Sequence, residues 1–188
     1  DGEILFKGSN VMLGYFNKPE ATEDVIDANG WFHTGDVGEL INGYLKITDR
    51  KKELFKTSGG KYVAPQVIEN ILKESYLIEQ AMIIGEHQKF VSALVVPSIE
   101  NLKSWCIKNG IEFSSTQEAI KNEDVLKKYQ TIIEEKNKAL GHIEQVKKFV
   151  LLADEWTPQN GMLTPTMKLK RKVLMTMYAK QIENMYLN

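Results

Sequence analysis

The chain has 188 residues, of which 43% are hydrophobic and 26% are charged, which suits one globular domain or a small domain joined to a piece of another. Lysine and arginine together number 24 against 25 aspartates and glutamates, for a formal net charge of −1. This balance argues against a nucleic-acid partner, because duplex-binding domains carry a strong basic excess. No apolar run approaches the roughly 20 residues that cross a bilayer, so at most peripheral membrane contact is expected.

The start of the chain and its single cysteine indicate its origin and compartment. The sequence begins without an initiator methionine, so we expect a piece of a longer protein. Cys106 is the only cysteine and cannot form an internal disulfide, which fits a reducing compartment, and we predict a soluble cytoplasmic protein. Because Cys106 lies in a segment of helical character, we expect a buried or half-buried structural thiol rather than a nucleophile.

Residues 1–51 are rich in glycine and in turn signals, which predicts short antiparallel strands. Residues 39–41 and 44–47 read as two strands joined by Asn42-Gly43, a dipeptide that tolerates the positive φ values of a tight hairpin. One helical turn is expected after Pro19. We interpret this region as the β-rich end of a larger amino-terminal domain.

The character of the chain changes at residues 49–56, where charge is dense, and we place a domain boundary near Lys52. Residues 52–188 are predicted to form a small α+β domain, with a sheet of about three strands flanked by helices. The expected elements are a helix from Pro65, strands at 81–84 and 91–96, a short helix opened by the capping box 115–118, an amphipathic helix over 125–140 stopped by Gly141, a strand at 146–152 and a terminal helix over 174–185.

Short motifs occur in a fixed order along most of the chain. They are Gly2-Glu3-Ile4-Leu5 with Val11-Met12-Leu13-Gly14-Tyr15, then Gly30 to Asp36, then Asp49 to Lys56 with Gly59-Gly60-Lys61 and Pro65 to Glu69, and finally Leu163 to Arg171. In this order they resemble the adenylate-forming superfamily of acyl-CoA synthetases, luciferases and peptide-synthetase adenylation domains. Residues 141–149 and the run Thr164-Pro165-Thr166-Met167-Lys168 look most like the long-chain fatty-acyl-CoA synthetases. Many relatives have Gly-Lys where this chain has Met167-Lys168, a departure that keeps the lysine.

The resemblance implies an ATP-dependent, AMP-forming ligase that works in two half-reactions. A fatty-acid carboxylate attacks the α-phosphate of ATP, and the coenzyme A thiol then attacks the acyl carbonyl so that AMP leaves. Because the first step brings an anion against a polyanion, positive charge must stabilise the transition state. By resemblance Lys168 supplies that charge, as a compact ammonium on a long stem. The alternative is a solvated base in a cluster with Lys170, Arg171 and Lys172.

Four further roles follow from the resemblance. Asp36 matches an aspartate that accepts hydrogen bonds from the ribose hydroxyls, and Arg50 matches an arginine that also holds the ribose. Their plainer interpretations are a turn-forming Gly-Asp and a surface ion pair. Lys52 matches the hinge about which the small domain rotates between half-reactions. Ser58, Gly59 and Gly60, with charge from Lys56, match the loop that faces the coenzyme A tunnel, where a plain turn is the alternative.

Other parts of the active site are expected outside this chain. The phosphate-binding loop, the glutamate that holds Mg²⁺ and the acyl pocket belong to the chain's own amino-terminal adenylation domain, which is its expected partner. We therefore expect ATP, coenzyme A and Mg²⁺ to serve the full-length enzyme and not to bind this fragment tightly. No metal site is expected here, since His87, His142 and Cys106 lack ligand spacing. His33 is expected to be a packed strand residue rather than an acid or base.

Two alternatives stay open. The first is another acyl-activating ligase, either a fatty-acyl-AMP ligase, a luciferase-like ligase or a shorter-chain synthetase, because acyl length is set outside this chain. The second is a non-catalytic module in which Lys147, Lys148 and the 168–172 cluster contact anionic lipid. The near-neutral charge weakens that interpretation, since binding to phosphate-rich surfaces draws on many cations. The sequence assigns neither the oligomeric state nor the acyl chain length.

Overall fold

The computed structural model describes residues 2–187 and divides into two compact units, Asp1–Leu54 and Phe55–Asn188. The division falls a few residues after Lys52, where the sequence analysis places the boundary. Each unit is described by itself. Within residues 2–187, no helix has both the length and the apolar character needed to cross a membrane.

The first unit is an antiparallel sheet with strand order β1-β2-β3 and one short helix. Asn42 and Gly43 join β2 to β3 with φ values of 51° and 82°, which confirms the predicted hairpin. The helix begins at Pro19, as expected for a residue whose missing N–H has no partner in the first turn. The elements are β1 (Glu3–Phe6), α1 (Pro19–Glu23), β2 (Phe32–Ile41) and β3 (Tyr44–Arg50).

The second unit is α+β, as predicted, with a three-stranded sheet of order β6-β7-β8. Strands β6 and β7 pair antiparallel, and β7 and β8 pair parallel. Before the sheet lie the hairpin β4 (Phe55–Lys56) and β5 (Tyr62–Val63) and helix α2 (Pro65–Lys73). The remaining elements are β6 (Ile78–Ile84), β7 (Val91–Pro97), α3 (Ile99–Lys108), α4 (Thr116–Ala119), α5 (Glu123–Asn137), β8 (Val146–Leu151), α6 (Arg171–Met177) and α7 (Ala179–Tyr186).

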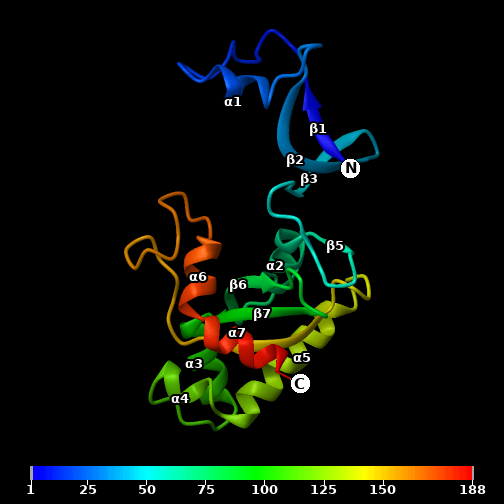
Figure 1. Cartoon of the computed structure of the whole chain (residues 1–188). Coiled ribbons are helices and arrows are strands. Elements are labelled where there is room, and N and C mark those ends of the chain that lie inside the picture. The colour runs from blue at the N-terminus through cyan, green and yellow to red at the C-terminus, as the bar shows by residue number, and fades with distance from the viewer. Residues whose placement is uncertain (1, 188) are drawn as a thin grey trace. The chain divides into compact units, whose positions relative to one another are not determined.

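Helices cover both faces of this sheet (Figure 1), so its central strand β7 is buried throughout. Alternate side chains of β7 enter different clusters, as strand geometry requires. Ala93 and Val95 join the cluster that contains residues of α2, α3 and α5, whereas Leu94 and Val96 join the cluster that contains residues of α6 and α7. A strand buried on both faces reads as a continuous apolar run, which is what residues 91–96 show.

Local signals placed several helix ends correctly. Ser115 accepts a hydrogen bond from the backbone N–H of Glu118, which confirms the predicted capping box. The start of α5, for which the sequence analysis named no cap, is capped by Asn122, which accepts from the N–H groups of Asp124 and Val125. Cys106 lies in α3 and is fully buried, as expected for a structural thiol, and burial raises its pKa above the usual thiol range.

Two helical predictions were wrong in detail. Helix α5 ends at Asn137 rather than continuing to Leu140, because the Asn137 side chain turns to exchange two hydrogen bonds of 2.9 Å with the backbone of Val146. The terminal helix is two helices, since Tyr178 leaves the helical conformation with φ −103° and ψ 22°. The buried ring of Tyr178 packs against Trp156, with 6.5 Å between ring centroids.

Candidate functional site

Asp36 and Arg50, the residues expected to hold the ribose, lie directly opposite each other on β2 and β3. The Arg50 Nε donates to Asp36 Oδ1 at 3.1 Å. The Arg50 side chain is 55% exposed and the Asp36 side chain is 27% exposed, so the Asp36 carboxylate is accessible from solvent. An exposed pair of this kind contributes only about 0 to 1 kcal/mol to stability, so its geometry matters more than its energy.

The backbone before Asp36 is held in a defined turn. Gly35 has φ +72°, a left-handed conformation that a side chain would disfavour. The Thr34 hydroxyl donates to the carbonyl of Ile4 at 2.7 Å and accepts from the N–H of Asp36 at 3.1 Å. Asp36 is therefore anchored to β1 through its own N–H and the Thr34 hydroxyl.

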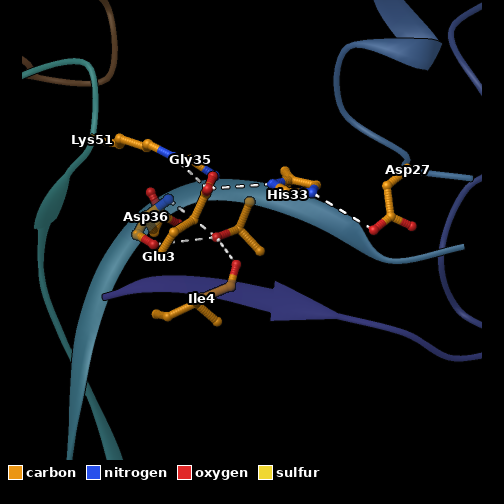
Figure 2. A network of polar contacts seen from close by, with 8 residues as sticks. Glu3, Ile4, Asp27, His33, Gly35, Asp36 and Lys51 are labelled. Carbon is orange, nitrogen blue, oxygen red and sulfur yellow. Dashed lines mark hydrogen bonds and ion pairs between the residues drawn. The ribbon is translucent and has the colours of Figure 1, made fainter. Parts of the chain in front are cut away.

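A second acidic residue, Glu3, supports the same turn (Figure 2), and the sequence analysis gave it no role. Its carboxylate accepts from Lys51 Nζ at 2.7 Å and from the Gly35 N–H at 3.2 Å, and it lies 3.3 Å from His33 Nδ1. The hydrogen bond from Lys51 is the main cause that lowers the pKa of Glu3 below its usual range. The sequence signal that could have singled out Glu3 was its position at the start of the first motif.

His33 is half-buried on β2 and lies between two carboxylates. Besides its contact with Glu3, its Nε2 lies 4.0 Å from Asp27 Oδ2. The Glu3 carboxylate is 8% exposed, whereas the imidazole is 38% exposed. This placement fits a residue that supports the strand, although it is less packed than the sequence analysis expected.

Lys52 is exposed, in the turn that follows β3. The residue before it belongs to the first unit, because the Lys51 N–H donates to the carbonyl of Gly35 at 2.8 Å. The turn is closed by the Leu54 N–H, which donates to the carbonyl of Arg50 at 3.1 Å. Lys52 therefore occupies the segment just before the division between the units.

Ser58, Gly59 and Gly60 form the exposed turn between β4 and β5. Gly60 has φ +73°, whereas Gly59 does not have a left-handed backbone, so only Gly60 is required by the conformation of the turn. The Ser58 N–H donates to the carbonyl of Gln88 at 2.9 Å, which ties the turn to the β6–β7 loop. Lys56 is exposed, and its ammonium lies 4.7 Å from the centre of the Tyr62 ring.

Lys168 is exposed on a closed loop of residues 163–170, which we call the lysine loop. The Thr164 N–H donates to the carbonyl of Lys168 at 2.8 Å, and the Lys168 N–H donates to the Thr164 hydroxyl at 3.0 Å. Met167 has φ +62°, a conformation that favours glycine. The resemblance implies a glycine at this position, and a glycine would adopt this backbone with less strain than Met167.

Figure 1 shows the lysine loop, just before α6, and the β4–β5 hairpin on opposite sides of the second unit. A rigid unit with two such segments can present only one of them to a given surface at a time. The two groups of predicted residues in this unit are therefore separate surfaces rather than one site.

Residues 53–188 match the protein-family model described as AMP-binding enzyme C-terminal domain. The chain belongs to this family. The match begins close to Phe55, where the second unit starts, so the α+β unit of the structure corresponds to the AMP-binding enzyme C-terminal domain.

Relatives of the whole chain extend the match through the first unit. The chain is 44% identical to long-chain-fatty-acid–CoA ligase 1 of Homo sapiens over 99% of its length. Among solved structures it is similar to the adenylation domain of a carboxylate reductase from Mycobacterium chelonae, with TM-score 0.80, 27% identity and 100% of this chain covered. It also resembles the A domain of a carboxylic acid reductase from Segniliparus rugosus, solved with AMP and a co-purified carboxylic acid, with TM-score 0.79, 26% identity and 98% covered.

The chain spans only 27% of the length of the human ligase and 28% of each of the two reductase chains.

Within residues 2–187, no group of three or more His, Cys, Asp or Glu side chains lies close enough together to hold a metal ion.

Proposed function

We propose that the chain is the carboxyl-terminal part of an ATP-dependent, AMP-forming long-chain fatty-acid–CoA ligase. The observation that carries the proposal is Lys168, an exposed ammonium on a hydrogen-bonded loop within the residues that the family model matches. The substrate class is supported by the 44% identity to a human long-chain-fatty-acid–CoA ligase. Nucleotide and carboxylate chemistry is supported by the related reductase domain solved with AMP and a carboxylic acid.

Lys168 stabilises the first half-reaction by charge. As the fatty-acid carboxylate attacks the α-phosphate, negative charge accumulates on the phosphate oxygens and pyrophosphate leaves. An ammonium placed against those oxygens offsets the repulsion between the two anions, and it is worth most where water is excluded. The hydrogen bonds of the loop fix the backbone position of Lys168, so less conformational entropy is lost when its ammonium reaches the nucleotide.

Asp36 and Arg50 hold the nucleotide in this proposal. A carboxylate has two acceptor oxygens, which matches the two hydroxyls of a ribose. Arg50 contacts one of these oxygens at 3.1 Å and so orients the carboxylate, while the Thr34 hydroxyl anchors the backbone beneath it. Glu3 and Lys51 complete the support for this turn.

The second half-reaction requires a different surface of the same domain. We propose that rotation about Lys52 withdraws the lysine loop and presents the turn Ser58-Gly59-Gly60, with Lys56 beside it, to the pantetheine arm of coenzyme A. The placement of the two segments on opposite sides of the second unit supports this alternation. Exposed backbone at Gly59 and Gly60 permits close approach of a narrow chain.

The exposed apolar side chains of the first unit indicate that it packs against a partner domain. In residues 2–54 no apolar side chain is buried, and large ones such as Leu40 (76% exposed) and Tyr44 (80%) face solvent. A sheet of this kind needs an apolar layer against it to be stable. We propose that the ligase's own amino-terminal adenylation domain supplies that layer, the acyl pocket and the Mg²⁺ ligands, so that ATP does not bind tightly to this chain alone. The cytoplasmic location stays a prediction.

The test compares the two half-reactions in the full-length ligase. Lys168→Ala should lower acyl-adenylate formation, measured as pyrophosphate release from ATP and palmitate, by about 100-fold or more. Thioester formation from supplied palmitoyl-adenylate and coenzyme A should change by less than about threefold, since that step does not use the ammonium. Lys172→Ala, an exposed lysine on α6, is the matched control and should leave both rates unchanged.

Equal losses in both half-reactions for Lys168→Ala would contradict the assigned role. Fatty acids of different chain length, assayed with the parent enzyme, decide the substrate class. A preference for short acids would replace the long-chain assignment with the shorter-chain alternative while leaving the chemistry in place.

A further inference from the structure

The lysine loop has a defined internal shape but needs an attachment to the rest of its domain. Its own hydrogen bonds close the loop between Thr164 and Lys168, and the Lys170 N–H donates to the carbonyl of Met162 at 2.9 Å. These contacts are local and set how the loop is folded. Leu163 is buried in the cluster that contains Trp156, and Leu169 packs against it, so apolar contacts also anchor the loop to the domain. Apolar contacts have no preferred direction, so the direction in which Lys168 points depends further on the polar contact at the end of the loop.

The end of the loop is held by an ion pair between residues that are 102 positions apart. The first residue of α6, Arg171, donates from Nη1 to Glu69 Oε1 at 2.7 Å and from Nη2 to Glu69 Oε2 at 3.0 Å. Glu69 lies on α2 and is 5% exposed. The same carboxylate accepts from the N–H of Ile83 on β6 at 2.8 Å. One buried carboxylate therefore joins α2, β6 and the start of α6.

The chemistry of this contact favours orientation. A guanidinium that donates through both terminal nitrogens to both oxygens of a carboxylate is fixed in plane and direction, which a lysine ammonium would not be. Because Glu69 is already held by the Ile83 N–H, the fork also fixes the position of Arg171 relative to β6. A buried charge is costly unless it is paired, so the pair resists opening. Lys168 lies three residues before this fixed point.

We propose that Glu69 and Arg171 are positioning residues for Lys168: their bidentate ion pair sets the angle at which the lysine loop leaves the domain and so aims the ammonium during acyl-adenylate formation. This inference rests on the proposed function of Lys168. The pair touches no substrate, and its effect is transmitted through residues 168–171 of the backbone.

The first experiment measures the loop directly, in the 188-residue chain. The double variant Glu69→Gln with Arg171→Met removes the ion pair without leaving a lone buried charge, and it keeps an oxygen for the Ile83 N–H. Amide hydrogen exchange at Thr164, Lys168 and Lys170, followed by NMR, should become at least about tenfold faster, while exchange in β7 stays unchanged. Unchanged protection of the loop amides would overturn the proposal.

The second experiment measures catalysis in the full-length ligase. The double variant should lower kcat for acyl-adenylate formation by about tenfold, with the KM for ATP changed less than about twofold and thioester formation from supplied acyl-adenylate unaffected. Arg171→Lys keeps the charge but not the fork, so it should retain only part of the rate. Equal losses in both half-reactions would indicate a merely structural role and overturn the assignment.

A matched control separates the effect of the ion pair on the position of Lys168 from its effect on the stability of the fold. Tyr129→Phe removes a buried hydrogen bond of 2.7 Å to the carbonyl of Leu77, on the opposite face of the sheet from α6. It should lower the thermal midpoint without changing adenylation kcat, and a loss equal to that of the double variant would refute positioning. If Lys168→Ala leaves adenylation intact, the proposed function fails, but the exchange experiment still decides whether the pair holds the loop.

Discussion

Leu94 offers a direct test of the view that β7 separates two cores in the second unit. It is 0% exposed, lies opposite Met82 on β6 and Val150 on β8, and packs in the cluster that contains Trp156. Leu94→Ala removes three carbon atoms, worth roughly 0.8 kcal/mol each, or about 2.4 kcal/mol of transfer free energy. A cavity inside a sheet covered on both faces cannot collapse fully, so the total loss should be about 3 to 5 kcal/mol.

The measurement is urea unfolding followed by tryptophan fluorescence. The two units can unfold separately, so the experiment is best done with Trp31→Phe, which leaves only the two tryptophans of the second unit, Trp105 and Trp156. The control is Leu126→Ala on α5, which removes the same atoms from a side chain that is 38% exposed and should cost less than about 1 kcal/mol. A loss below about 2 kcal/mol for Leu94→Ala, or equal losses for both variants, would refute the reasoning.

Two further predictions concern single polar side chains. Glu3→Gln should reduce the acid sensitivity of the first unit. The Lys51 hydrogen bond lowers the pKa of folded Glu3 below the ordinary value of 4.5, so the unfolded chain binds the proton more readily. The stabilisation is present above that pH and is lost as pH falls through the folded pKa. The protection factor of the Gly35 amide, which is the exchange rate of an unfolded peptide divided by the observed rate at the same pH, should therefore fall on acidification in the parent and less so in the variant. An equal pH dependence of the protection factor in both proteins would exclude the pair as the cause. Asn122→Ala should destabilise the second unit by about 1 kcal/mol, because two N–H groups at the start of α5 lose their acceptor, whereas Asn122→Asp should cost much less; a urea midpoint unchanged by Asn122→Ala would show that water replaces the cap.

Local chemistry explains why much of the fold could be predicted. The Asn42-Gly43 hairpin, the proline-started helices α1 and α2 and the Ser115 cap depend on residues within a few positions of one another. The same holds for the apolar run of β7. The predictions that failed are the carboxyl end of α5 and the unbroken terminal helix, and both outcomes depend on partners distant in the chain, Val146 and Trp156.

The candidate site divides in the same way. The family resemblance carried by the motif order singled out Lys168, Asp36 and Arg50, and their side chains have the charge and the acceptor oxygens that a phosphate and a diol require. Their roles stay predictions, whereas the contact between Asp36 and Arg50 is a finding of the structure. Motif order placed Lys168 in the chain but gave no information on what holds its loop.

The primary sequence thus sufficed for the family, the α+β class and the chemical character of the proposed active residues. The supports behind them emerged only from the folded chain: Glu3 meets Lys51 across 48 positions, and Glu69 meets Arg171 across 102. The physical reason is that an ion pair between residues far apart in the chain has no periodicity and no local signal, unlike an i,i+4 pair within a helix. Any of the chain's 25 acidic side chains could pair with any of its 24 basic ones, and the packing of α2, β6 and α6 selects which of them meet.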